Sequence, residues 1–313
     1  MSEPVAFTLD GHAGALAARK WGRGTPRYLA LLCHGYGEHS GRYEYVASRL
    51  VADGAVVYAM DHVGHGLSDG ERVLIDDFER VVEDFRLLDL TARRDDPATP
   101  VVLVGHSMGG MIAARYAQRY GSELTAVVLS GPVLGRWAAV DALLAAEEIP
   151  DTPIDPSTLS RDPEVGRAYV EDALVWHGPF KRPTVQALKK CLETITEAGP
   201  IDSVPVLWLH GEDDRLVPLD GTASGWETLA GPDSSSKIYP QARHEIFNEI
   251  DRDRVLDDVV DFVGAHLPRL AAPEEQAPRG ERGADPARDR GADPARDRGA
   301  DPARDRGADP ARD

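Results

Sequence analysis

Residues 101–110 constrain the fold of this chain more than any other segment. Residues 101–104 are apolar and mostly β-branched, which is typical of a fully buried strand, and residues 111–118 predict a helix. Between them, the five residues from Gly105 to Gly109 match the pattern G-x-S-x-G. At a strand-to-helix turn this pattern presents a serine side chain at the end of a buried strand. We therefore predict that Ser107 is a nucleophile; the alternative is a glycine-rich turn with an idle serine.

The two glycines have a physical reason in such a turn. The turn is sharp, and the absence of a Cβ at Gly105 and Gly109 lets the strand and the helix approach each other closely. The first N–H groups of the helix then point towards a reacting oxygen.

The composition argues against several classes of protein. The chain has 313 residues and a net charge of −18, which argues against nucleic acid as a partner and against electrostatic docking on anionic membranes. No apolar run approaches the length of a membrane span, and the N-terminal residues lack the pattern of a signal peptide. Because Cys33 and Cys191 are the only cysteines, no disulfide framework is implied. We expect a cytoplasmic protein.

Buried strands and amphipathic helices alternate along most of the chain. This alternation predicts an α/β fold with a mostly parallel, doubly wound sheet, preceded by a short antiparallel pair. The expected strands cover residues 5–9, 15–20, 28–33, 55–60, 101–104, 125–130, 204–209 and 237–239, and the expected helices cover 43–53, 76–94, 111–118 and 252–267.

The alternation stops at residues 133–200, where helical segments and breaks rich in proline and aspartate contain no buried strand. An insertion at this place would lie beyond the carboxyl edge of the sheet and cover the site as a cap. The core would then consist of residues 1–132 and 201–271.

The composition changes abruptly after Ala272. An octapeptide that begins at Arg282 occurs four times up to Asp313, and each copy contains two arginines and two aspartates. It lacks large apolar residues and contains a proline in every copy. We therefore predict that residues 272–313 form a disordered tail without a role in the chemistry.

A serine hydroxyl is a weak nucleophile, so it needs a neighbouring base that a carboxylate orients. In folds with G-x-S-x-G the partners follow in the order serine, acid, histidine. Two histidines, His244 and His266, come after a candidate acid. His266 is expected late in the closing helix, whereas His244 follows the last strand, and we predict that His244 is the base.

The acid is expected just after the strand over residues 204–209. The loop at this place contains both Asp213 and Asp214, and either carboxylate could reach the base. The pattern itself leaves the acid open between these two aspartates.

Two backbone N–H groups complete a site of this kind by binding the oxyanion. One belongs to the residue after the nucleophile, which is Met108. The other comes from the glycine-rich loop after the strand over residues 28–33, where Tyr36 is the best candidate. The alternative is a tight loop whose glycines serve only the backbone geometry.

Several histidines near the expected strand ends invite a metal-site hypothesis. Asp61, His62 and His65, with His34 and His39 as further ligands, match no known zinc spacing. A turn held by local hydrogen bonds is favoured, so we predict no metal and no cofactor.

Four segments together resemble the monoacylglycerol lipases of the α/β-hydrolase superfamily, and bacterial members most closely. They are residues 34–43 (HGYGEHSGRY), 61–72, 105–110 (GHSMGG) and 210–218 (HGEDDRLVP), and the resemblance covers about residues 25–265. In the family pattern the acid lies four residues before the proline, which identifies Asp214. The resemblance also supports Tyr36 and Met108 as oxyanion donors, although tyrosine departs from the small or aliphatic residues usual at its position. The repeat tail has no counterpart.

The resemblance implies a cofactor-independent serine hydrolase that cleaves monoacylglycerol esters to fatty acid and glycerol through an acyl-enzyme. One alternative is a general carboxylesterase or lysophospholipase. An alternative of another class is a catalytically idle hydrolase fold that acts as a binding protein, against which the presence of all three triad residues counts. The sequence gives neither the acyl-chain preference nor the oligomeric state.

A lipid substrate also requires apolar surface near the entrance of the site. The cap segment supplies six candidates: Val140, Leu143, Leu144, Ile149, Ile154 and Leu159. The first three share one face of an expected helix. We predict that several of the six line an acyl tunnel or contact a membrane or micelle transiently; the alternative is that they pack on the sheet.

Overall fold

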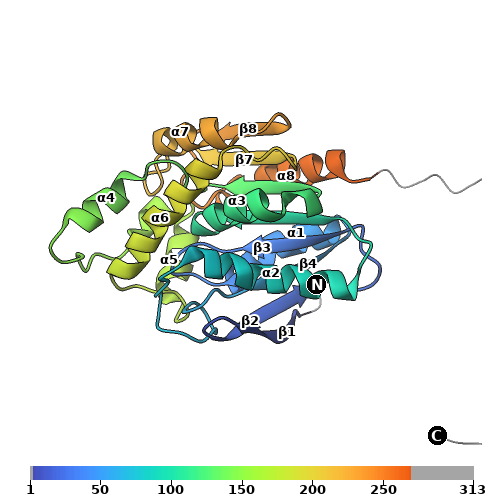
Figure 1. Cartoon of the computed structure of the whole chain (residues 1–313), viewed down its shortest axis with the longest axis horizontal. Helices are drawn as coiled ribbons and strands as arrows, with labels where there is room; N and C mark the ends of the chain where they lie inside the picture. The colour runs from blue at the N-terminus through green and yellow to red at the C-terminus, as the bar shows by residue number, and fades with distance from the viewer. Residues whose placement is uncertain (1–2, 269–313) are drawn as a thin grey trace, which may run out of the picture. The chain divides into compact units, whose positions relative to one another are not determined.

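The computed structural model describes residues 3–268. An eight-stranded sheet of order β1-β2-β4-β3-β5-β6-β7-β8 forms its centre (Figure 1). β1 (Val5–Gly11) pairs antiparallel with β2 (Gly14–Trp21), and β2 pairs antiparallel with β4, whereas all other neighbours are parallel. The predicted fold class is therefore confirmed. The predicted tail, residues 272–313, lies outside the described residues.

The middle strands of the sheet are buried along their whole length. Helices cover both faces of the sheet, so these strands are continuously apolar rather than alternating. They are β3 (Tyr28–Cys33), β4 (Ala55–Met60), β5 (Val101–His106), β6 (Ala126–Ser130) and β7 (Val206–Gly211), with the more exposed β8 (Ser234–Tyr239) at the edge.

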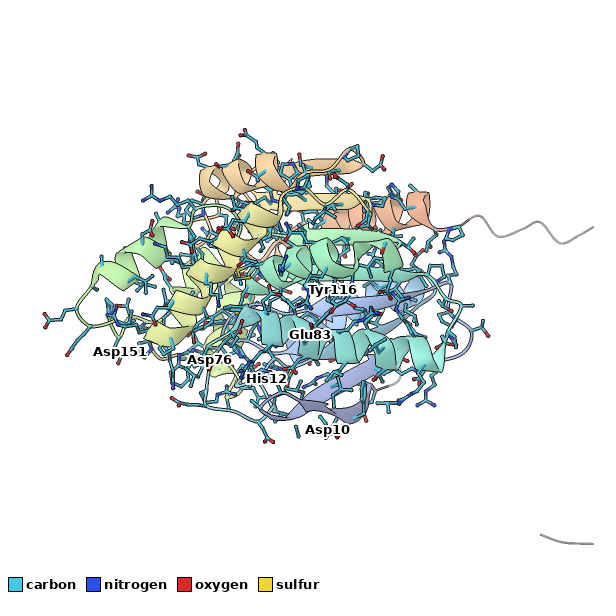
Figure 2. All side chains as sticks on the ribbon, viewed as in Figure 1. Asp10, His12, Asp76, Glu83, Tyr116 and Asp151 are labelled. Atoms are coloured by element: carbon cyan, nitrogen blue, oxygen red, sulfur yellow. The ribbon has the colours of Figure 1, made fainter. Side chains whose placement is uncertain are left out.

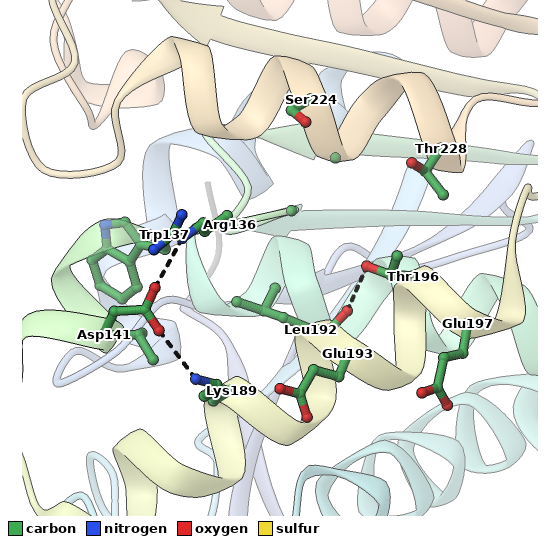
Figure 3. A pocket seen from close by; sticks show the side chains of 13 residues that line it. Arg136, Trp137, Asp141, Lys189, Leu192, Glu193, Thr196, Glu197, Ser224 and Thr228 are labelled. Carbon is green, nitrogen blue, oxygen red and sulfur yellow. Dashed lines mark hydrogen bonds and ion pairs between the residues drawn. The ribbon is translucent and has the colours of Figure 1, made fainter. Parts of the chain in front are cut away.

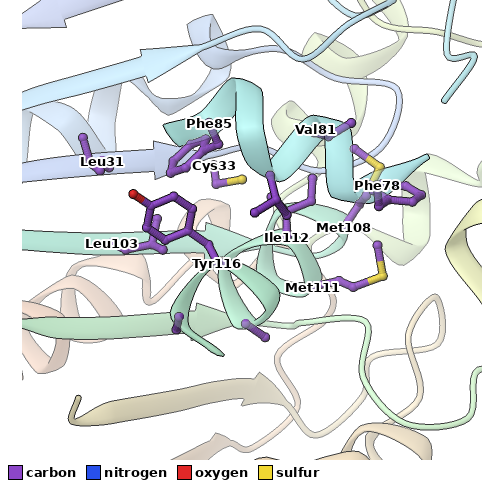
Figure 4. Packing of buried hydrophobic residues seen from close by; sticks show 14 of the residues in the cluster. Leu31, Cys33, Phe78, Val81, Phe85, Leu103, Met108, Met111, Ile112 and Tyr116 are labelled. Atoms are coloured by element: carbon purple, nitrogen blue, oxygen red, sulfur yellow. The ribbon is translucent and has the colours of Figure 1, made fainter. Parts of the chain in front are cut away.

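Different helices cover the two faces of the sheet. α1 (Glu44–Ala52) and α8 (Arg252–His266) pack on one face, and α2 (Phe78–Asp95) and α3 (Met108–Tyr120) pack on the other. Figure 4 shows Phe85 of α2 beside Cys33 of β3, with Ile112 of α3 in the same hydrophobic cluster. The first hairpin is fastened to α2 by His12, whose Nδ1 lies 2.7 Å from Oδ2 of Asp84 (Figure 2).

Between β6 and β7 the chain leaves the sheet and forms α4 (Ala138–Ala145), α5 (Pro163–Glu171) and α6 (Arg182–Ala198). These helices occupy the segment 133–200 that the sequence predicts as a cap, and this fully described segment contains no strand. A further helix, α7 (Leu219–Leu229), follows β7 and is absent from the prediction. None of the helices within residues 3–268 combines the length and apolar character that crossing a bilayer requires.

Candidate active site

Ser107 occupies the sharp turn between β5 and α3. Its φ of 56° and ψ of −121° form a backbone conformation that non-glycine residues rarely adopt. A Cβ at Gly105 would lie 2.4 Å from the carbonyl oxygen of Gly109, and one at Gly109 would lie 2.1 Å from that of Cys33. Both positions therefore require glycine because the backbones touch. The two glycines therefore allow the sharp turn on which Ser107 lies.

The structure brings Ser107, His244 and Asp214 into one hydrogen-bonded series. Nε2 of His244 lies 2.9 Å from Oγ of Ser107, and Nδ1 of His244 lies 2.7 Å from Oδ2 of Asp214. All three residues are buried. Ser107 and His244 are 137 residues apart in the sequence, so the fold brings them together. With Nδ1–H donating to the carboxylate, Nε2 is free to accept the serine proton.

Backbone groups hold the Asp214 carboxylate in place. Its Oδ1 accepts hydrogen bonds from the N–H groups of Leu216 (3.0 Å) and Val217 (2.8 Å), and its Oδ2 lies 3.3 Å from Nε2 of His210. Burial alone would raise the pKa of this carboxyl, but the neighbouring His244 and His210 hold it well below its ordinary value. Asp214 is therefore a carboxylate at neutral pH.

Burial and the neighbouring carboxylates have opposite effects on the pKa of the His244 imidazole. Burial lowers the pKa of its imidazole, but the carboxylates of Asp214, Glu245 and Glu38 outweigh burial and raise the pKa above its ordinary value. The neighbouring His106 stays neutral, since burial and His244 lower its pKa to about 4.

Of the two predicted oxyanion donors, Met108 follows Ser107 directly and Tyr36 lies in the loop after β3. A Cβ at Gly35 would lie 3.2 Å from Cβ of Ser107, which shows how closely the loop after β3 approaches the nucleophile. Within residues 3–268, neither the N–H of Tyr36 nor that of Met108 donates a hydrogen bond. Both N–H groups are thus without an acceptor in this part of the chain, as a group that binds an oxyanion has to be.

A small cavity of about 40 Å³ adjoins Ser107. Two of the predicted cap residues, Ile154 and Leu159, line it. Tyr36 also lines it, together with three aromatic side chains that the sequence analysis did not select, namely Trp137, Tyr169 and Phe180. The rings of Tyr36 and Phe180 stack at 4.3 Å between centroids. The Tyr36 side chain, stacked on Phe180, therefore narrows the cavity.

The other predicted cap residues lie elsewhere. Val140 is buried at 3% exposure and does not face outward, whereas Leu143 and Leu144 are half-buried and pack against the core. Ile149 is half-buried too, and it lines neither the cavity nor the groove described next. The face of α4 that carries these side chains is thus turned largely towards the protein.

A larger groove of about 480 Å³ lies between α4, α6 and α7 (Figure 3). Its floor includes Trp137, Val140 and Leu192, and its rim is charged, with Asp141 paired to both Arg136 and Lys189. Trp137 lines the groove and the catalytic cavity alike, and its Nε1 donates to the carbonyl oxygen of Leu216.

Three of the histidines considered for a metal, His34, His62 and His65, pack against one another. Nδ1 of His34 donates to the carbonyl oxygen of Gly35, and its Nε2 accepts from the N–H of His62. Asp61 accepts hydrogen bonds from Ser40 and Leu67. Among the described residues, no group of histidine, cysteine and carboxylate side chains is arranged to hold a metal ion.

Comparisons with known proteins agree with this picture. The profile of the family described as serine aminopeptidase, S33, matches residues 24–251. A monoacylglycerol lipase from Mycolicibacterium smegmatis is 41% identical over 77% of this chain and 90% of its own length. The human monoglyceride lipase is 36% identical over 79% of this chain and 84% of its own length. The structure of Paleococcus ferrophilus monoacylglycerol lipase, at 29% identity, matches with a TM-score of 0.68 over 80% of this chain and 99% of that one.

A sheet of this order, with a serine in a strained turn after β5 and a histidine after the last strand, defines an α/β hydrolase. Within that class, the chain belongs to the monoacylglycerol lipase family and is a carboxylic ester hydrolase. The family that the sequence motifs predict is thereby confirmed.

Proposed function

We propose that this protein hydrolyses monoacylglycerols to fatty acid and glycerol through an acyl-enzyme on Ser107. The observation that carries the proposal is the series of hydrogen bonds from Ser107 through His244 to Asp214. Side chains of the 133–200 segment line the cavity beside Ser107 and His244. Two relatives of the chain are named monoacylglycerol lipase and monoglyceride lipase.

In this mechanism, Nε2 of His244 removes the proton from Oγ of Ser107 while the oxygen attacks the ester carbonyl. The same nitrogen returns the proton to the glycerol oxygen, so glycerol leaves and the acyl group stays on Ser107. His244 then activates a water molecule, which releases the fatty acid. Asp214 orients the imidazole throughout and stabilises its positive charge. The reaction needs no cofactor.

The negative charge on the carbonyl oxygen is stabilised by the N–H groups of Tyr36 and Met108. Losing one such donor costs about 3–4 kcal/mol of transition-state stabilisation in comparable sites. The backbone supplies both groups, so side-chain substitution at position 36 changes the shape of the cavity more than the oxyanion contact.

The lining of the catalytic cavity supports a lipid substrate. The aromatic and aliphatic lining from Trp137, Ile154 and Phe180 suits an acyl chain better than a polar substrate.

A substrate panel tests the proposal. We expect the wild-type protein to hydrolyse monoacylglycerols faster than di- or triacylglycerols and lysophospholipids, and Ser107→Ala to reduce hydrolysis to background. A fluorophosphonate probe should label the wild-type protein and not Ser107→Ala. Preference for lysophospholipids or soluble esters would identify a lysophospholipase or general carboxylesterase, and absence of labelling would indicate a binding protein.

We further propose that the cap segment contacts the membrane or micelle from which the substrate comes. The net charge of −18 favours apolar over electrostatic attachment. Leu143 and Leu144 on α4 keep part of their surface accessible, which supports a contact of this kind.

A further inference from the structure

Two carboxylates and one guanidinium are buried together beside the serine and its base. Arg42 donates to Oε2 of Glu38 at 2.7 Å and makes a two-pronged contact with Glu245 at 2.8 and 2.9 Å. The remaining carboxylate positions are also satisfied: Tyr43 donates to Glu38 at 2.6 Å, and Asn248 donates to Glu245 at 2.8 Å. All three charged side chains are at most 10% exposed.

This cluster joins the parts of the protein that the proposed reaction needs. Oε1 of Glu38 accepts a hydrogen bond of 2.6 Å from the N–H of Gly35, directly before the oxyanion donor Tyr36. Glu245 directly follows the base His244, and its N–H donates to the carbonyl oxygen of Leu159 in the cap segment. Arg42 therefore links the oxyanion loop with the loop of the base, across about two hundred residues of sequence.

The cluster also carries an excess of negative charge. Two carboxylates against one guanidinium leave one negative charge, in a site from which water is largely excluded. A buried ion pair contributes little to stability compared with an apolar replacement, so stability alone does not account for it.

The charges that face His244 come from several elements. Asp214 follows β7, His106 ends β5 with its ring 4.8 Å from that of His244, and Glu38 and Glu245 belong to the cluster. The cap segment contributes the carbonyl oxygen of Thr158, which accepts from the N–H of His244. Of these groups, the carboxylates favour a protonated imidazole, whereas His106 stays neutral because its pKa is lowered to about 4.

We propose that Glu245 is a positioning residue for the base, which holds the His244 loop to the oxyanion loop through Arg42 and supports the positive charge on His244. The inference rests on the proposed function, because it concerns the moment when His244 holds the serine proton. Asp214 supports this charge from the Nδ1 side, and the cluster adds a second negative charge from another direction.

The test is the pH dependence of kcat/KM for a soluble short-chain p-nitrophenyl ester. Activity requires neutral His244, so it falls as the pH drops through the pKa of the free base. In Glu245→Gln we expect this acid limb to move to lower pH by on the order of one unit, the scale of one charge acting in a partly buried site. At one unit below the wild-type midpoint, the variant would then keep about half of its plateau activity and the wild type about a tenth.

The matched control is Glu249→Gln. Glu249 is another buried glutamate of the same loop, paired with Arg161 at 2.9 Å, but it lines no part of the cavity. We expect this variant to lose stability and keep the wild-type acid limb.

Arg42→Lys tests the link between the two loops. It retains the positive charge but loses the two-pronged contact, so it should lower the plateau of kcat/KM and leave the acid limb of the pH profile in place.

A folded Glu245→Gln protein with an unmoved acid limb would overturn the inference, as would an equal shift in Glu249→Gln. If Glu245→Gln does not fold, Glu38→Gln must show the same shift, because it removes the same excess charge. Failure of the proposed function is distinguishable, since it would appear as residual activity in Ser107→Ala at every pH.

Discussion

Oδ2 of Asp214 lies 2.7 Å from Nδ1 of His244, whereas the carboxylate of the preceding residue, Asp213, pairs with Arg215 at the surface. The backbone of the loop is the reason why one carboxylate is buried at His244 and the other lies at the surface. The N–H groups of Leu216 and Val217 turn towards the Asp214 side chain and fix it inside the protein.

We expect Asp214→Asn to lower kcat/KM by several orders of magnitude, because an amide no longer fixes the imidazole tautomer or stabilises its charge. The corresponding change in a well-studied serine protease costs about 10⁴-fold in kcat. Asp213→Asn is the matched control and should change activity only a few-fold. Steady-state kinetics of both variants on one soluble ester decide the matter, and a larger loss in Asp213→Asn would reverse the assignment.

This pair of aspartates shows how far sequence reasoning reaches. Order along the chain and position after a strand were enough to select His244 and to confine the acid to two neighbours. The choice between them depends on which carboxylate meets the N–H groups of Leu216 and Val217, and residue types alone do not encode it. The family pattern supplied that choice.

Other contacts of the site cannot be predicted from the sequence. Glu38 and Arg42 belong to the motif over residues 34–43, but the contact of Arg42 with Glu245 joins distant loops, and only the fold reveals it. Tyr169 and Phe180 come from the cap segment, where no periodic pattern marks a cavity lining. The strands β3 to β7 were predictable because they are continuously apolar, whereas α7 has two glycines and few large apolar side chains.

The cap leucines provide a test of lipid contact. α4 is apolar on most of its surface, so spacing alone could not tell which face is buried. We expect Leu143→Ser combined with Leu144→Ser to depress hydrolysis of long-chain monoacylglycerol far more than that of a soluble short-chain ester. Leu87→Ser with Leu90→Ser, on the exposed side of α2, is the control and should leave both activities unchanged. A parallel fall of both activities would mean that the cap leucines only pack on the core.

The buried histidines predict acid sensitivity of the fold. Burial, with the neighbouring His65, lowers the pKa of His62 to about 3, and burial lowers that of His65 to about 4. The unfolded chain protonates these residues near pH 6.5, so between pH 6.5 and 4 it binds more protons than the folded protein. Stability is therefore lost as the pH falls through this range, by about 2 kcal/mol per histidine between pH 6.5 and 5.

Denaturant unfolding at pH 7 and pH 5 measures this loss. We expect His65→Gln to show a smaller difference between the two pH values than the wild-type protein, whatever its stability at pH 7. His177→Gln removes an exposed histidine and should keep the wild-type difference. An unchanged difference in His65→Gln would show that its protonation is not linked to unfolding.

Trp137 lines both the catalytic cavity of about 40 Å³ and the groove of about 480 Å³. Figure 3 shows its place in the groove. Its ring lies edge-on to Phe180 at 6.4 Å between centroids, and its Nε1 donates to the carbonyl oxygen of Leu216 at 3.0 Å. Removing the indole should join the two spaces and give a long acyl chain an apolar path along Val140 and Leu192.

We therefore expect Trp137→Ala to raise the ratio of palmitoyl to butyryl ester hydrolysis several-fold, at a cost in stability of about 3–5 kcal/mol at most. Trp226→Ala is the control, because Trp226 packs against Trp208 and lines neither space. It should lower the melting temperature without changing the ratio. An unchanged ratio in Trp137→Ala, or an equal change in both variants, would mean that the groove receives no part of the acyl chain.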